Sequence, residues 1–236
     1  MKKKGYQGIL RILFGFSLIL FFSSCGLPVY YIIYPPVNPG SPTDIQDGRY
    51  FSFKTADQVN KTTDIYRGID VYYKIYNTEN DRNLDIQQIQ AVNSEFSQSG
   101  FNKMQSLGYA TLSSEPKLHN SSDVLFDKED SDHFIKIRLF DEGSEDNRYE
   151  AGFESDKISF NTGSEPIRSN GKNFQFDDKN PPEQGDTDYK HKSEAESEFF
   201  WVAAFAVSVG RDGFFQAYYS SLLPLGSIKI PKDTSN

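Results

Sequence analysis

Alternating apolar and polar residues mark the clearest predicted strand, at residues 68–76. Ile69, Val71, Tyr73 and Ile75 alternate with Asp70, Tyr72, Lys74 and Tyr76. Successive side chains of a strand point to opposite faces, so a period of two predicts that the first set is buried on one face. Residues 49–54 alternate in the same way, with Phe51 and Phe53 directed inward. We therefore expect both segments to lie in one core.

A helical pattern replaces the strand pattern at residues 85–107. Apolar residues recur there at steps of three and four: Ile86, Ile89, Val92, Phe96, Met104 and Leu107. This spacing predicts an amphipathic helix, or two helices broken near Gly100. Gly108 suits the C-terminal cap, so a strand can restart at residues 109–112.

The most hydrophobic stretch after the N-terminal region is residues 199–209. It has no polar face until its end, which predicts a strand covered on both sides. Residues 210–213 then favour a hairpin turn. Further strands are expected at residues 133–140, 149–153, 157–161, 173–176, 214–219 and 225–230. The polar tract 177–197 predicts a long mobile loop.

The N-terminus carries a targeting pattern. Lys2, Lys3 and Lys4 precede an apolar run at residues 9–22, and Ser23-Ser24-Cys25-Gly26 follow it. The run is shorter than a membrane-spanning helix requires, so we expect cleavage of a signal peptide at residues 1–24. Cys25 is the only cysteine and cannot form an internal disulfide, which favours lipid attachment at its sulfur. An ordinary signal peptide or an uncleaved anchor stays open, because Phe22 occupies a position where Leu is usual.

The pattern predicts four parts in the chain: the signal peptide, a lipidated and proline-rich tether at residues 25–47, one domain at residues 48–231 and a tail at residues 232–236. Prolines in the tether exclude a helix and favour extended chain. Within the tether, residues 30–34 are either an edge strand or an aromatic contact with the membrane surface.

Charge narrows the classes of partner. Removing residues 1–25 leaves 21 Lys and Arg against 33 Asp and Glu, a net charge of −12 over 211 residues. This excess argues against binding to nucleic acid and against electrostatic docking on anionic lipids, so the lipid at Cys25 must provide the membrane contact. Fourteen Tyr and twenty Phe supply enough apolar area for a core without disulfides.

Catalytic chemistry finds little support in the sequence. The three histidines, His119, His133 and His191, stand beside no nucleophile, and no phosphate-binding or zinc-binding spacing occurs. We expect a protein that is not an enzyme and needs no cofactor or metal. Three carboxylate clusters could hold calcium, but solvated acidic loops are the favoured interpretation because none has the calcium-loop spacing. They comprise Asp127, Glu129, Asp130 and Asp132; Asp141, Glu142, Glu145 and Asp146; and Asp177, Asp178, Asp186 and Asp188.

Tyrosines are the better candidates for a binding surface. The outward series of the strand at residues 68–76 includes Tyr72 and Tyr76, and Tyr218 and Tyr219 lie near the end of the chain. Exposed Tyr is enriched at protein contacts, so these four residues are the predicted site for a protein partner. The alternative is that a helix or a second sheet covers them.

Taken together, the aromatic strand at residues 50–54, the Tyr-rich strand at residues 68–76 and the long hydrophobic strand resemble an immunoglobulin-like or fibronectin type III β-sandwich with a helical insertion. The strand Trp of the type III module is missing, and Phe51 or Phe53 could take its place. The N-terminal signal, Pro35-Pro36 and the ending from Tyr219 to Gly226 also resemble uncharacterised lipoproteins of spirochaetes.

This resemblance implies a location, and it carries over no site residue. It suggests lipid anchoring to the outer membrane, on its periplasmic face or at the cell surface. The expected function is a non-catalytic binding or adhesion module. The alternative is a periplasmic structural or accessory subunit of an envelope complex.

Overall fold

The computed structural model describes residues 31–38, 50–118, 122–128, 134–139, 149–151, 164–176, 181–192 and 198–232. The chain divides into two units, Met1–Tyr31 and Ile32–Asn236, and the fold below is that of the second unit. Several predicted features lie outside the described residues: the signal peptide, Cys25, His119, His133, the strand at residues 157–161 and the acidic cluster at residues 141–146.

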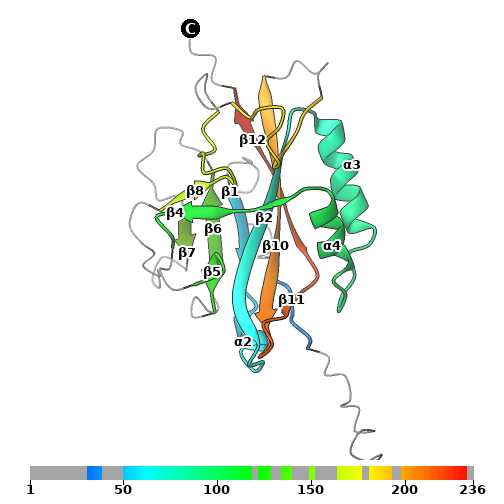
Figure 1. The fold of residues 1–236 in the computed structure, drawn as a ribbon, viewed down its shortest axis with the longest axis vertical. Helices are drawn as coiled ribbons and strands as arrows, with labels where there is room; N and C mark the ends of the chain where they lie inside the picture. Colours follow the sequence, from blue (N-terminus) through cyan, green and yellow to red (C-terminus); the bar gives the residue numbers. More distant parts are fainter. Residues whose placement is uncertain are drawn as a thin grey trace, which may run out of the picture. The chain divides into compact units, whose positions relative to one another are not determined.

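The described part of the second unit is mainly β, as predicted, with largely antiparallel sheets and two well-formed helices, α3 and α4 (Figure 1). Its elements are β1 (Tyr50–Lys54), α2 (Asp57–Asn60), β2 (Tyr66–Tyr76), α3 (Glu79–Gln90), α4 (Ser99–Ser106), β3 (Ala110–Thr111), β4 (Ser113–Glu115), β5 (Phe126–Asp127), β6 (Phe134–Arg138), β7 (Tyr149–Ala151), β8 (Glu165–Ile167), β9 (Tyr189–Lys190), β10 (Phe199–Arg211), β11 (Ala217–Tyr219) and β12 (Leu223–Pro231). Among these described elements, no helix combines the length and the apolar character that crossing a membrane requires.

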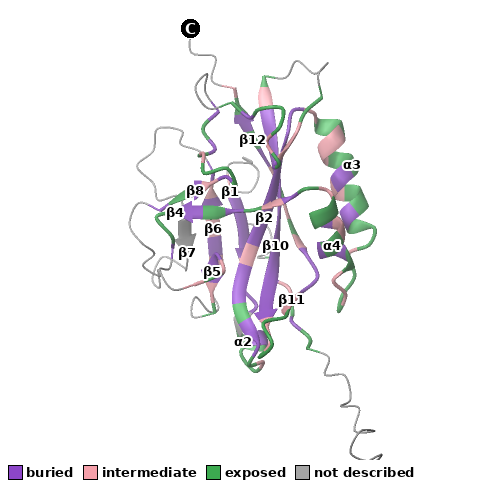
Figure 2. Cartoon of the chain, viewed as in Figure 1, coloured by how far each residue is buried: buried purple, intermediate pink, exposed green. Residues whose placement is uncertain are grey.

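Strands β10 and β2 form the centre of the large sheet. They pair antiparallel over almost their whole length, with Ala204 opposite Tyr73. β11 and β12 also pair with β10, while β3, β5 and β9 pair with β2. All of β10 between its two end residues is buried, which confirms the prediction of a strand covered on both sides (Figure 2).

Two apolar cores lie on opposite faces of this sheet. On one face, side chains of β2, β10 and β12 pack against the small sheet formed by β1, β6 and β7, whose core residues include Phe51, Phe53, Ile135 and Ile137. On the other face, α3 and α4 supply Ile89, Phe101 and Met104. The second unit therefore has three layers, with the helices and the small sheet on either side of the large sheet (Figure 1).

The helical region differs from the prediction in its boundaries. Helix α3 begins at Glu79, where the Thr78 hydroxyl caps the helix by accepting a hydrogen bond from the Asp81 N–H. The break lies before Gly100, which is inside α4. Glycine is needed at position 100, because a Cβ there would collide with Asn93. The side chain of Asn93 in turn exchanges two hydrogen bonds with the backbone of Leu222. This contact joins the connection between α3 and α4 to the residue just before β12.

Three predicted strands have different outcomes. β6 is confirmed, with Ile135 and Ile137 buried. Residues 173–176 form only one isolated bridge, between Asn173 and Ile167, although Phe174 and Phe176 are buried. Residues 31–36 form no strand. The prediction of an edge strand at residues 30–34 is therefore wrong for residues 31–34, which the structure describes. The first sheet-like contact of this segment is the bridge between Val37 and Lys54.

Candidate functional site

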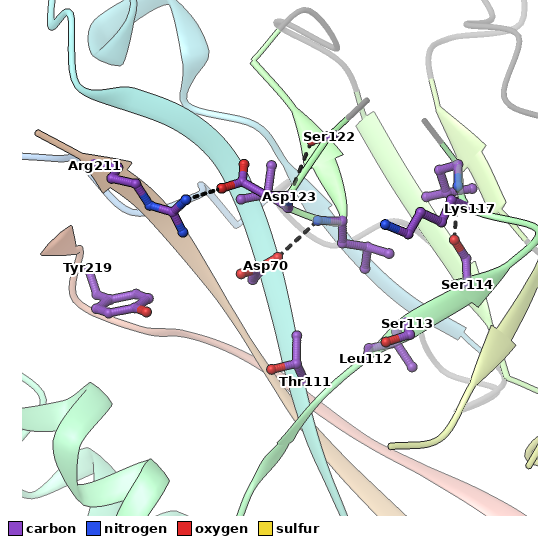
Figure 3. A pocket seen from close by; sticks show the side chains of 13 residues that line it. Asp70, Thr111, Leu112, Ser113, Ser114, Lys117, Ser122, Asp123, Arg211 and Tyr219 are labelled. Carbon is purple, nitrogen blue, oxygen red and sulfur yellow. Dashed lines mark hydrogen bonds and ion pairs between the residues drawn. The ribbon is translucent and has the colours of Figure 1, made fainter. Parts of the chain in front are cut away.

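A polar cavity of about 380 Å³ lies beside β2, where the segments around β3, β4 and residues 122–125 meet the end of β10 (Figure 3). Its wall carries two carboxylates, two cations and several hydroxyl groups. The residues that define its chemistry are Asp70, Lys117, Asp123, Arg211, Ser113 and Tyr219. It is the candidate binding site of the described part of the chain.

Asp70 lies where strand β2 changes its partner. On its N-terminal side, Gly68 and Ile69 pair with β5. On its C-terminal side, Tyr72 and Tyr73 pair with β3. Gly68 is required here, because its φ is +148° and an added Cβ would collide with the carbonyl oxygen of Phe126. The gap between the two partner strands leaves the Asp70 side chain at the cavity, where it accepts a hydrogen bond of 2.9 Å from the Leu125 N–H.

Burial raises the pKa of Asp70 from 3.8 to about 6. The hydrogen bond from Leu125 opposes this rise, the carboxylate of Asp123 adds to it, and the guanidinium of Arg211 opposes it. Arg211 pairs with Asp123 at 2.5 Å on the cavity rim. The cavity therefore presents an ion pair together with a carboxyl group that changes its charge near neutral pH.

The cavity offers hydrogen bonds and charge to a ligand. Among the described residues that line it, none is a histidine or a cysteine, and its serines and threonine have no imidazole base beside them. Tyr219 closes one side, with its ring stacked on that of Phe101 at a centroid distance of 3.6 Å. This lining suits reversible binding of a polar group.

Two of the four tyrosines expected at the surface are buried. Tyr72 is only 6% exposed and contacts the ring of Phe101, while Tyr76 is fully buried. The hydroxyl of Tyr76 donates to Asp85 of α3 at 3.1 Å and lies 2.9 Å from the Tyr109 hydroxyl. The expectation of exposure is therefore wrong for both residues, because α3 and α4 cover this face of β2. The alternative of a covering helix is the arrangement found.

The other two tyrosines are half-buried. The hydroxyl of Tyr218 donates to the Asp212 carboxylate at 3.0 Å, and Tyr219 lines the cavity. Of the four predicted site residues, only Tyr219 reaches the candidate site. The sequence pattern did not predict Asp70 as a site residue, because a polar residue at this alternating position is expected on the outward face of any such strand.

The predicted mobile loop at residues 177–197 is described only at residues 181–192, and there the structure has a buried ion network. Arg168 is fully buried and donates to both carboxylate oxygens of Asp188, at 3.0 and 2.8 Å, and to Asp186 at 2.6 Å. The Tyr73 hydroxyl of β2 also donates to Asp188, at 2.5 Å. The described middle of this tract is therefore packed against the central sheet, where its β9 pairs with β2, and the expectation of a mobile loop is wrong there.

The acidic residues form no metal site among the described residues, where no three His, Cys, Asp or Glu side chains come together. Asp186 and Asp188 instead hold Arg168, which already supplies the opposite charge. Most of the other clustered carboxylates, including residues 129–132, 141–146 and 177–178, lie outside the described residues.

Comparison with known proteins gives no relative: no family model, curated protein or solved structure matches the chain.

Replacing Asp70 with Asn should change the pH dependence of stability. The folded-state pKa of about 6 lies above the ordinary value of 3.8, so the folded protein binds this proton more tightly than the unfolded chain does. Stability contributed by Asp70 is then fully present below pH 3.8 and is lost as the pH rises through about 6. Asp70→Asn should be more stable than the wild type by about 3 kcal/mol at pH 7, and the two proteins should be about equally stable at pH 3, in urea unfolding. A difference independent of pH would contradict the assigned environment.

Proposed function

We propose that this protein is a lipid-anchored protein of the cell envelope that acts as a non-catalytic binding or adhesion module. The observation that carries the proposal is the order of the N-terminal residues: three lysines, an apolar run, two small serines and then the only cysteine, Cys25. A signal peptidase needs small residues before its cut, and a single thiol at the new N-terminus is the attachment point that a diacylglyceryl group requires.

The anchor accounts for membrane attachment that the domain's charge does not favour. Each buried methylene of an acyl chain contributes about 0.8 kcal/mol, and stable anchoring takes more than one chain. A thioether-linked diacylglyceryl group at Cys25 supplies two chains, and acylation of the new amino group supplies a third. The mature chain carries a net charge of −12, so attraction to anionic headgroups contributes nothing.

The proposed domain type is an immunoglobulin-like or fibronectin-III-like sandwich with a helical insertion. Support comes from two largely antiparallel sheets that share one apolar core, in which Phe51 and Phe53 of β1 lie together with Ile69 and Val71 of β2. Such a fold serves many functions, so the fold does not itself identify the ligand. The insertion containing α3 and α4 covers the outer face of the large sheet.

Within this domain, the polar cavity is the proposed place of contact with a partner. Asp70, the Arg211–Asp123 pair and Lys117 suit a hydrogen-bonding polar segment. The half-exposed Tyr219 adds a flat aromatic surface of the kind that interfaces favour. The partner is thus expected to be a protein that inserts polar side chains into the cavity beside β2, between β3 and β5.

Protease treatment of intact cells tests the display of this module. We expect externally added protease to remove the protein while a soluble periplasmic marker in the same cells stays intact. Full protection on intact cells, with digestion only after the outer membrane is permeabilised, would contradict an adhesion role at the surface. That result would assign the protein to the periplasmic accessory class.

A further inference from the structure

Two phenylalanines stand exposed at the tip of the β10–β11 hairpin. Phe214 is 93% exposed and Phe215 is 81% exposed, the highest values among the exposed large hydrophobic side chains of the described residues. Isolated exposed hydrophobic residues are common on soluble domains and need no explanation. Two adjacent aromatic rings at one loop tip, held there by the backbone, are a different case.

The turn is built to hold both rings outward. The Asp212 carboxylate accepts hydrogen bonds of 2.9 Å from the N–H groups of Phe214 and Gln216. The Phe215 N–H donates to the Asp212 carbonyl, and Phe215 has a φ of +64°. A bulky residue is unfavourable in this left-handed conformation, where Gly or Asn would fit without strain. The phenyl ring is thus present despite the conformation of the turn.

Other exposed apolar side chains gather where the chain joins the domain, beside the same hairpin. Ile33 packs with Ile65, Tyr66 and Tyr218, and it lies so close to Gly210 that a Cβ there would collide with it. Its sequence neighbours Ile32 and Tyr34 are exposed. Both the N-terminal segment and the hairpin therefore end at one pole of the domain, near α2 (Figure 1).

Phe96 extends this apolar surface. It is 63% exposed in the connection between α3 and α4, and its ring meets that of Tyr34 edge to face at a centroid distance of 6.2 Å. Tyr34 is fixed by two backbone hydrogen bonds with the Asn60 side chain, at 2.8 and 2.9 Å. The apolar pole consists of Ile32, Tyr34, Phe96, Phe214 and Phe215.

The length of the tether limits how far this pole can be from a membrane. From Cys25 to Ile32 the chain spans at most about 25 Å, at roughly 3.6 Å per residue. A domain held by lipid at Cys25 therefore keeps the point where its chain begins within that distance of the bilayer. Exposed aromatic side chains near this point can therefore reach the bilayer. There they favour the boundary between headgroups and acyl chains, where a ring can leave water.

We propose that the apolar pole rests on the lipid bilayer, with Phe214 and Phe215 inserted at the boundary between headgroups and acyl chains. This inference rests on the proposed anchor at Cys25. Because the mature chain is strongly acidic, the contact is apolar and does not require anionic lipid. The domain is then held with β10 directed away from the membrane, so that Glu198, at the other end of β10, lies about 40 Å further out.

An environment-sensitive fluorophore on the hairpin tests this contact. In the mature lipoprotein the sulfur of Cys25 is a thioether, so one added cysteine can be labelled alone with nitrobenzoxadiazole. Gly213→Cys is suitable, because no atom lies within 4 Å of a Cβ built there and its φ is not left-handed. Glu198→Cys, at the exposed far end of β10, is the matched control. The full mature protein is reconstituted in phosphatidylcholine vesicles.

We expect the Gly213→Cys label to emit at shorter wavelength and to be quenched several-fold less by aqueous iodide than the Glu198→Cys label. Adding Phe214→Ser and Phe215→Ser should return the label at position 213 to water, with no loss of folding because both rings are exposed. A label that stays shielded without the two rings would show that the fluorophore itself inserts, and would overturn the proposal.

Flotation of the same vesicles tests the lipid anchor separately from the contact between the apolar pole and the bilayer. Protein that does not float with the vesicles means that the anchor has failed. Protein that floats, with both labels equally accessible to iodide, means that the bilayer contact is wrong while the anchor stands. Shielding that disappears when the protein is diluted within the vesicles would assign the apolar pole to a second copy of the chain, and would also overturn the proposal.

Discussion

Replacing Arg168 with Met is expected to lower the free energy of unfolding by about 3–5 kcal/mol. The guanidinium is fully buried and holds the two carboxylates Asp186 and Asp188. Without it, Asp188 stays in the interior beside Tyr73 with its charge uncompensated, which is far less favourable than a paired charge. Urea unfolding of the purified protein at neutral pH measures the change.

The chain offers a matched control between the same two segments. Lys172 and Glu183 form an exposed ion pair at 3.4 Å, so Lys172→Met should change stability by less than about 1 kcal/mol. Adding Asp188→Asn to Arg168→Met should recover part of the loss, because it removes the unpaired charge. If Arg168→Met costs no more than Lys172→Met, the network does not hold this tract on the sheet.

The second large effect is expected from Cys25→Ala. Without the sulfur no diacylglyceryl group can attach, so the variant should leave the detergent phase or accumulate with its signal peptide uncleaved. The physical reason is that the proposed anchor would provide all of the stable attachment through two or three acyl chains, while a strongly acidic domain supplies none electrostatically. Phase partitioning with immunoblotting measures both the location and the size of the product.

Ser24→Ala is the control for Cys25→Ala, because it keeps a small residue before the cut and leaves the sulfur in place. It should be processed and should partition like the wild type. A processed Cys25→Ala product that partitions into detergent as fully as the wild type would refute lipid anchoring. In that case the apolar pole alone would have to hold the protein at the membrane.

The main strands could be predicted from sequence because their signals are local. Period-two alternation placed Ile69, Val71, Tyr73 and Ile75 in one core, and the unbroken apolar run located β10 at the centre of the sheet. The start of α3 was missed because its first turns, from Glu79, are polar and depend on the Thr78 cap rather than on an apolar face.

The features that could not be predicted depend on contacts between residues far apart in the sequence. Tyr72 and Tyr76 occupy the face that alternation marks as outward, but tyrosine can be buried when its hydroxyl finds a partner, as with Asp85 for Tyr76. The tract around Asp188 reads as a polar loop, and only its contact with Arg168 orders it. The cavity at Asp70 arises where β3 and β5 meet β2, which no local pattern encodes.

The proposed anchor and the apolar pole together define an orientation for the domain. In this proposed orientation, the tether and the β10–β11 hairpin would lie toward the membrane, and the opposite end of β10 would lie away from it. Arg211 and Tyr219 belong to the strands that flank the hairpin, so the polar cavity opens beside the membrane-proximal part of the sheet. A partner protein would then meet the domain close to the bilayer surface.

Mass spectrometry of the N-terminal peptide from the membrane-extracted protein tests the central claim most directly. The account predicts a chain that begins at Cys25, with a diacylglyceryl thioether on its sulfur and an acyl group on its amino terminus. A mature chain whose Cys25 carries a free thiol, or one cleaved elsewhere, would contradict the lipid anchor and the membrane orientation built on it.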